Sequence, residues 1–127
     1  SGILAIAAAL LGSGAVLAID NDPRAIQAAG QNVDRNGVAP STDLRVGSLE
    51  QARTGDYHVV IANILAPVLH DMLAEGLLDL VHPGGTLVLS GLLESQLAEM
   101  TSDLQERGAT ILDTTTQGRW AAVTATR

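Results

Sequence analysis

The segment AVLAIDNDP, residues 15–23, decides the fold class that the sequence predicts. Its five apolar residues, 15–19, form the pattern of a short strand that is buried on both faces. Asp22 and Pro23 follow as an expected helix N-cap and first helical residue. A buried strand that leads directly into a helix is typical of an α/β protein with a parallel sheet. Asp20 then falls at the C-terminal end of the strand, where parallel sheets bind ligands.

Strands and helices alternate on both sides of this segment. Apolar runs predict further strands over residues 44–46, 57–62 and 86–90, and helical spacing predicts helices over 3–11, 23–36, 69–80 and 93–104. Pro83-Gly84-Gly85 predicts a turn. Residues 110–115 and 120–126 predict a hairpin around Gln117-Gly118. This order predicts a doubly wound, mostly parallel sheet with helices on both faces and a C-terminal antiparallel hairpin. Because such a fold starts with a strand and this chain starts with an apolar, buried helix, we expect the first strand to be missing.

The composition fits one acidic domain. The chain has 127 residues, 46% of them hydrophobic, and a formal net charge of −7, which disfavours direct binding of nucleic acid. It has no cysteine, and its histidines (His58, His70 and His82) fit no ligand spacing, so we expect no metal site. The longest apolar run, residues 3–11, is too short to span a bilayer, so we expect no membrane contact and a cytoplasmic location.

Three positions carry candidate ligand-binding groups. Asp20 can accept hydrogen bonds from two ribose hydroxyls, although it can instead cap the next helix. Ser1-Gly2 precedes an apolar helix, and Gly2 allows a ligand to approach the helix N-terminus. Asn63 follows the strand at 57–62. It can cap a helix, but Pro67 favours a helix that starts near residue 67, which leaves the Asn63 amide free for a ligand.

These strand ends resemble those of class I S-adenosylmethionine-dependent methyltransferases. The likeness is most specific to the PrmA family, which methylates a protein of the large ribosomal subunit. It rests on SGILAIAA (1–8), DNDP (20–23), NVDRNG (32–37), ANILA (62–66), PGG (83–85), LSGLLE (89–94) and GRW (118–120). Ser1-Gly2 matches only the end of the family's glycine motif. The resemblance also implies that the missing first strand belongs between the strand that ends at Asp20 and the strand that ends at Asn63. The resemblance therefore implies that residues 1–127 are an N-terminally truncated, S-adenosylmethionine-binding methyltransferase domain. The domain that recognises the ribosomal protein is expected to be absent.

The resemblance also assigns roles to individual residues. It implies S-adenosylmethionine as cofactor, bound by Ser1, Gly2, Asp20, Asn21, Gly47, Ser48 and Asn63. Asn63 is expected to orient the substrate amine, with Ile64 and Leu65 beside the path of the methyl group. The reaction implied is methylation of amines of a ribosomal protein, and the fragment alone is expected to be inactive. Two alternatives stay open: a nicotinamide-dependent oxidoreductase domain, which Asp20 fits equally well, and a catalytically inactive Rossmann-like interaction module.

Overall fold

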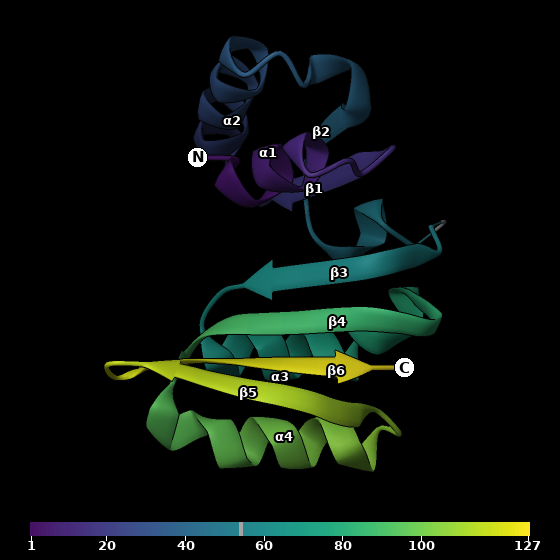
Figure 1. The fold of residues 1–127 in the computed structure, drawn as a ribbon, viewed down its shortest axis with the longest axis vertical. Coiled ribbons are helices and arrows are strands. Elements are labelled where there is room, and N and C mark those ends of the chain that lie inside the picture. Colours follow the sequence, from purple (N-terminus) through teal and green to yellow (C-terminus); the bar gives the residue numbers. More distant parts are fainter. Residues whose placement is uncertain (54) are drawn as a thin grey trace. The chain divides into compact units, whose positions relative to one another are not determined.

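The chain forms two compact units. The structure, a computed structural model, describes residues 1–53 and 55–127, and the boundary between the units falls at residues 54–55 (Figure 1). The first unit contains α1 (Ile3–Leu10), β1 (Val16–Asp20), α2 (Pro23–Arg35), η1 (Ala39–Ser41), β2 (Thr42–Val46) and η2 (Leu49–Gln51). The second contains β3 (Tyr57–Asn63), α3 (Ala66–Ala74), η3 (Leu77–Leu80), β4 (Val81–Leu93), η4 (Glu94–Gln96), α4 (Leu97–Glu106), β5 (Thr110–Gln117) and β6 (Trp120–Thr126).

In the first unit, the predicted strand that leads directly into a helix is confirmed. β1 pairs in parallel with β2, from Val16 beside Thr42 to Asp20 beside Val46. The Arg24 backbone N–H donates to Oδ1 of Asp22 at 2.9 Å, so Asp22 is the N-cap of α2. The core of this unit joins α1, α2 and β2 through Ile6, Val33, Val38, Ala9 and Leu44.

The predicted burial of the first helix and strand is wrong for most of their residues. Ile3, Leu10 and Leu11 are 69%, 63% and 88% exposed, because only the side of α1 that carries Ala5 and Ile6 packs against the unit's core. The apolar residues of β1 are half-buried rather than buried on both faces. β2 is the strand that β1 pairs with among the described residues. The expectation of a further strand beside β1 stays a prediction.

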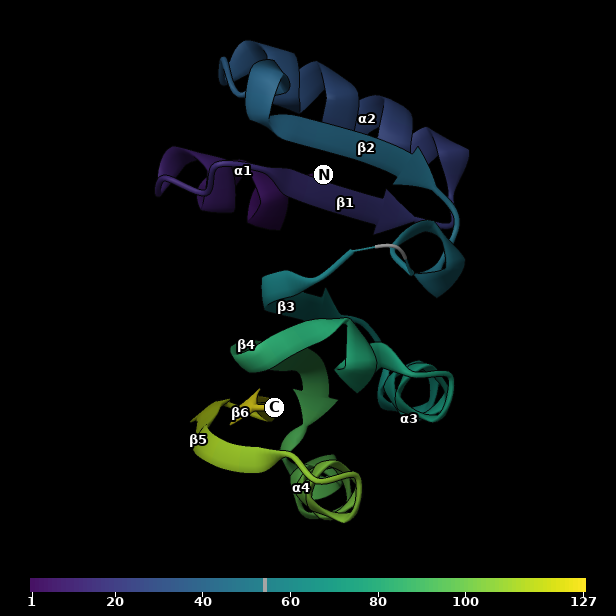
Figure 2. The same ribbon diagram turned by 90° about the vertical axis from the view of Figure 1, so that its right-hand side faces the viewer.

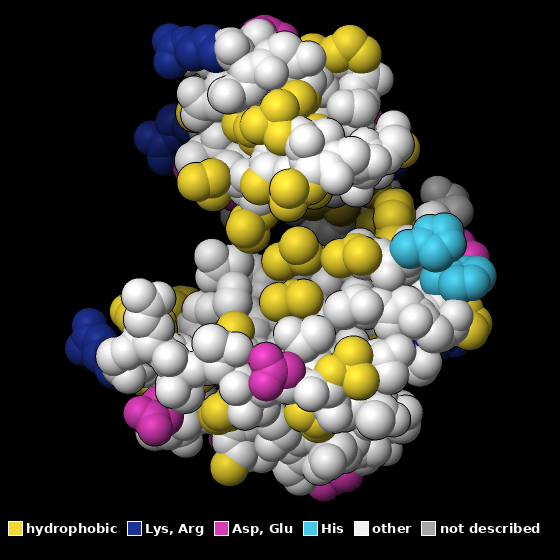
Figure 3. All heavy atoms as spheres, in the orientation of Figure 1, with side chains coloured by type: hydrophobic (Ala, Val, Ile, Leu, Met, Phe, Trp, Pro, Cys, Tyr) yellow, Lys and Arg dark blue, Asp and Glu magenta, His cyan; other side chains and the backbone are white. Residues whose placement is uncertain are grey.

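In the second unit, four strands form one sheet in the order β3-β4-β6-β5. β3 and β4 are parallel, whereas β6 is antiparallel to both β4 and β5, as the predicted hairpin requires. Figure 2 shows α3 and α4 on one side of this sheet. Side chains of both helices and of β4 are fully or almost fully buried there: Leu69, Leu73, Leu87, Leu89, Met100 and Leu104. On the other face, apolar side chains gather over β3 and β4 (Figure 3), where Val59 and Ile61 are 57% and 44% exposed.

Three predicted elements of this unit have different boundaries. The helix expected over 69–80 ends at Ala74, because Gly76 adopts a left-handed φ of 106° and only a short 3₁₀ helix follows. Pro83-Gly84-Gly85 is not a turn between elements but an irregularity inside the long strand β4. Leu93 ends β4 instead of opening a helix, because it pairs with Trp120 of β6. No helix among the described residues is long and apolar enough to cross a membrane.

Candidate functional site

The first unit brings the ends of β1 and β2 together. The Gly47 N–H donates to the Asp20 carbonyl at 3.0 Å, so the loop after β2 lies beside the end of β1. Asp20 is exposed, and its Oδ1 accepts the Asp22 N–H at 2.9 Å. This bond orders the turn before α2, and the exposed carboxylate keeps acceptor capacity for hydroxyl groups. Asn21, also exposed, lies in the same turn.

The loop after β2 contains an acidic group that the sequence analysis missed. The Ser48 N–H donates to Oε1 of Glu50 at 2.9 Å. This hydrogen bond, with the Glu50 N–H and the nearby Arg53 charge, holds the pKa of Glu50 below its ordinary value of 4.5. Gly47 has a φ of 148°, and a Cβ there would lie 2.6 Å from Cγ of Gln51, so this tight loop favours glycine. An acid two residues after Ser48 was the sequence signal for Glu50.

Ser1 and Gly2 pack against α2. The Asn32 side-chain amide donates to the Ser1 carbonyl at 2.9 Å, and a Cβ on Gly2 would lie 3.0 Å from Cβ of Ala29. Gly2 also has a φ of 78°. Close packing against α2 and the positive φ therefore both explain why residue 2 is a glycine. The hydrogen bonds of the described residues join neither Ser1 nor Gly2 to Asp20 or Ser48.

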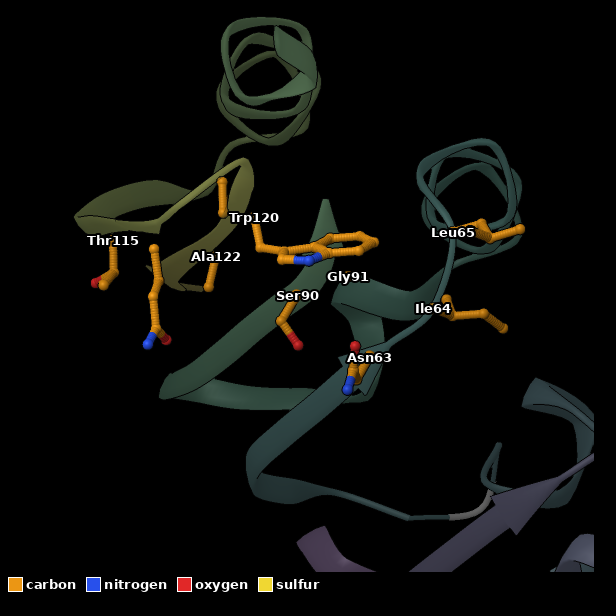
Figure 4. A pocket seen from close by; sticks show the side chains of 10 residues that line it. Asn63, Ile64, Leu65, Ser90, Gly91, Thr115, Trp120 and Ala122 are labelled. Atoms are coloured by element: carbon orange, nitrogen blue, oxygen red, sulfur yellow. The ribbon is translucent and has the colours of Figure 1, made fainter. Parts of the chain in front are cut away.

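The second unit contains an open hollow of about 650 Å³ at the end of β3 (Figure 4). It is lined by Asn63, Ile64, Leu65, Ser90, Gly91, Thr115, Gln117, Trp120, Ala121 and Ala122. The three predicted catalytic residues, Asn63 to Leu65, all line this hollow, and their catalytic roles stay a prediction. A hollow of this size and mostly apolar lining suits a small ligand or an extended side chain.

Asn63 is held at this hollow by β4. It is paired with Ser90, and the Ile64 N–H donates to the Ser90 carbonyl at 3.2 Å. Asn63 does not cap α3, because Leu65 occupies the N-cap position and Pro67 lies in the first turn. The predicted helix start near Pro67 is confirmed, and the alternative capping role of Asn63 is wrong. In Figure 4 the Asn63 and Ser90 side chains lie on the same side of the Trp120 ring.

Trp120 is a lining residue to which the sequence analysis gave no role. It pairs with Leu93 of β4 and Gln117 of β5, which places its indole beside Gly91 (Figure 4). Trp120 is 50% exposed, and the Arg119 guanidinium carbon lies 5.5 Å from the ring centroid. The sequence signal for it is that it is the single tryptophan of residues 1–127 and belongs to the GRW motif next to a predicted turn.

The polar side chains that line the hollow are uncharged. Asn63, Ser90, Thr115 and Gln117 supply amide and hydroxyl groups, and none of the ten lining residues carries a carboxylate, imidazole or cation. Such a surface can orient a ligand by hydrogen bonds but offers no strong acid or base. Over residues 1–53 and 55–127 no cluster of three His, Cys, Asp or Glu side chains is suited to hold a metal ion.

Comparison with known proteins identifies the family. The family model for ribosomal protein L11 methyltransferase (PrmA) matches residues 1–127. The curated ribosomal protein L11 methyltransferase of Desulforapulum autotrophicum is 40% identical over 126 residues, which are 98% of this chain and 41% of that protein. The chain thus spans about two fifths of the length of this relative.

Solved structures agree with this assignment. The crystal structure of the ribosomal protein L11 methylase from Lactobacillus delbrueckii subsp. bulgaricus is 33% identical, with a TM-score of 0.91 over 99% of this chain and 64% of that one. An RNA methyltransferase from Salinibacter ruber, solved with S-adenosyl-L-homocysteine, is 20% identical with a TM-score of 0.71, over 97% of this chain and 72% of that one, and shares the fold alone. These likenesses confirm the predicted Rossmann-like methyltransferase fold. The chain belongs to the PrmA family of ribosomal protein L11 methyltransferases.

Proposed function

We propose that the full-length protein containing this chain transfers methyl groups from S-adenosylmethionine to amines of ribosomal protein L11. The observation that carries the proposal is the uncharged hollow that Asn63, Ile64 and Leu65 line together with Trp120. The names of the relatives supply the substrate. A ribosomal protein substrate would place this activity in the cytoplasm.

In this proposal, residues 1–127 are the cofactor-binding methyltransferase domain. The exposed Asp20 carboxylate holds the ribose hydroxyls, and the Gly47-Ser48 loop with Glu50 flanks the adenine. Ser1, Gly2, Asn21 and Asn63 complete the expected set. The adjacency of the β1 and β2 ends, with the turn ordered by Asp20, supports these roles. When bound, the cofactor supplies a methyl group on a positively charged sulfur.

The residues of the hollow position the amine. The Asn63 side-chain oxygen accepts an N–H of the substrate nitrogen and so fixes the direction of its lone pair. Ile64 and Leu65 provide apolar lining beside it. Because the lining contains no titratable side chain, the amine's proton leaves to water through the open side of the hollow. In this mechanism, rate enhancement comes from positioning and from the polarity of the site.

A transfer assay tests the proposal. The full-length protein should move labelled methyl groups to ribosomal protein L11 purified from cells that lack the activity. It should also bind S-adenosylmethionine in preference to NAD. Preferred binding of NAD would support the oxidoreductase alternative, and binding of neither compound would support an inactive interaction module. Cofactor binding without transfer to L11 would overturn the substrate.

A further inference from the structure

Two opposite charges flank the hollow without lining it. The Arg119 guanidinium carbon lies 5.5 Å from the centroid of the Trp120 ring, which forms part of the wall. Asp113 Oδ2 accepts a long, 3.4 Å hydrogen bond from Oγ1 of Thr115, another lining residue. A ligand in the hollow therefore meets a neutral surface, with a cation next to one lining residue and a carboxylate next to another.

Arg119 is held at this position by its backbone. Its carbonyl accepts the Glu94 N–H at 2.8 Å, which ties the hairpin tip to η4. Gly118, with a φ of 59°, provides the turn that leads into Arg119 and Trp120. The ion pairs of the described residues do not include Arg119, and Glu94, the acid on the adjoining η4, is exposed to solvent. The Arg119 charge therefore acts on the indole and its surroundings without a neutralising partner in those pairs.

We propose that Arg119 biases the hollow toward the neutral form of the acceptor amine. This inference rests on the proposed function and adds a specificity-determining residue to it. An alkyl amine arrives as an ammonium ion, and one proton must pass to water, giving R–NH₂ and H₃O⁺, before the nitrogen lone pair can react. A nearby cation disfavours the ammonium form and so lowers the amine's pKa. Arg119 also lies over the indole ring, which weakens the attraction of that ring for an ammonium ion.

Asp113 provides an internal test, because its charge acts in the opposite direction. We would measure single-turnover methyl transfer to purified L11 by the full-length protein, from neutral to alkaline pH, with cofactor in excess. In Arg119→Gln the pKa that governs the rate should rise by about half a pH unit. That shift lowers the rate at neutral pH about threefold. Arg119→Lys should keep the wild-type pKa, since the charge is retained, and Asp113→Asn should lower it.

The outcomes separate this inference from the proposed function. An unchanged pKa in Arg119→Gln, or the same shift in Arg119→Lys as in Arg119→Gln, would overturn the role of the Arg119 charge. Wild-type protein that transfers no methyl group would instead reject the proposed function. Circular dichroism and thermal unfolding check that each variant folds. Arg119→Met serves as a second neutral variant if Arg119→Gln is unstable, and it should shift the pKa in the same direction.

Discussion

A Cβ atom on Gly91 would lie 2.9 Å from Oδ1 of Asn63, closer than side chains normally approach. The same Cβ would lie 2.8 Å from the Ile64 carbonyl oxygen. Gly91 therefore leaves the space in which the proposed amine-orienting side chain sits. The glycine after Ser90 is thus linked to the function proposed for Asn63 as well as to the backbone of β4.

Replacing Gly91 by alanine should disturb both stability and activity. Gly84, in the same strand, is a matched control, because its φ is 80° against 79° for Gly91 and nothing lies within 4 Å of its Cβ position. Both variants should lose about 1 kcal/mol of unfolding free energy through backbone strain. Gly91→Ala should lose a further 1–3 kcal/mol or so through the steric clash, and should also lose methyl transfer. Urea unfolding and transfer assays check this, and equal effects in the two variants would contradict it.

Asn63→Ala should slow methyl transfer more than it weakens cofactor binding. The amide at the end of β3 lies in the hollow, where we place the amine, so its loss misorients the reacting nitrogen. We expect kcat to fall about 100-fold, as for a misplaced reacting group, with a much smaller change in cofactor Kd. Single-turnover kinetics and calorimetry measure the two quantities separately. A loss of cofactor affinity as large as the loss of rate would move Asn63 to the cofactor side of the site.

Replacing Asp20 and replacing Asp22 should have different effects. The first should weaken cofactor binding, and the second should destabilise the fold. Asp20→Ala should weaken S-adenosylmethionine binding by about 1–3 kcal/mol, since a hydrogen bond to a charged group is lost. Asp22→Ala should instead cost about 1 kcal/mol of stability, because Asp22 caps α2 through the Arg24 N–H. Cofactor titration and thermal unfolding of both variants provide the readouts. Unchanged cofactor affinity in Asp20→Ala would remove Asp20 from the site.

From the sequence, short segments such as a strand followed directly by a helix were predicted better than the longer elements of this fold. The segment at 15–23 combined a strand, a cap and a proline that all favoured one structure, and both β1 and α2 formed as expected. The long strand β4 was not expected, because Pro83-Gly84-Gly85 has the local chemistry of a turn, whereas pairing with β3 resumes at Thr86 after Val81 and makes the segment an irregularity within one strand. Trp120 and Glu50 were missed for a related reason. Their positions depend on a hairpin register and a loop conformation, which the GRW motif and the acid after Ser48 do not specify by themselves.

Low pH should weaken the contact that Asp103 of α4 makes with His70 of α3. Asp103 of α4 contacts Nδ1 of His70 on α3 at 2.6 Å and accepts a hydrogen bond from Nε of Arg107 at 2.7 Å. Burial by itself raises the pKa of Asp103, but the His70 and Arg107 hydrogen bonds and charges outweigh it and hold the pKa below the ordinary 3.8. A lowered native pKa stabilises the fold above the unfolded value of about 3.9, and this contribution is lost as the pH falls through the native value.

Asp103→Asn tests this link. The variant should lose about 1–3 kcal/mol of unfolding free energy at neutral pH, and its stability should fall less steeply in acid than that of the wild type. Asp71→Asn, an exposed position on α3, is the control and should keep the wild-type dependence on pH. Chemical unfolding from about pH 7 to below about pH 4, the range set by the carboxyl pKa, measures both. Parallel curves for Asp103→Asn and the wild type would show that the link does not depend on charge.

The free edge of β3 should govern how residues 1–127 behave alone. Within the described residues β3 pairs only with β4, and Val59 and Ile61 leave 57% and 44% of their surface exposed. An exposed apolar edge with unpaired N–H and C=O groups favours pairing with another chain. We therefore expect residues 1–127 on their own to associate and to bind S-adenosylmethionine poorly. Val59→Lys should suppress the association, because a charge on an edge strand opposes pairing.

The opposite edge of the same sheet supplies the control. Leu112 of β5 is also 57% exposed, but β5 otherwise carries mostly threonine, with Asp113 and Gln117, so it is the poorer apolar edge. Leu112→Lys should therefore leave the association unchanged. Light scattering over a range of concentrations distinguishes the three chains. A monomeric wild-type chain that unfolds cooperatively and binds the cofactor with micromolar affinity would show that the β3 edge needs no partner, and would also reject the expectation of a missing strand beside it.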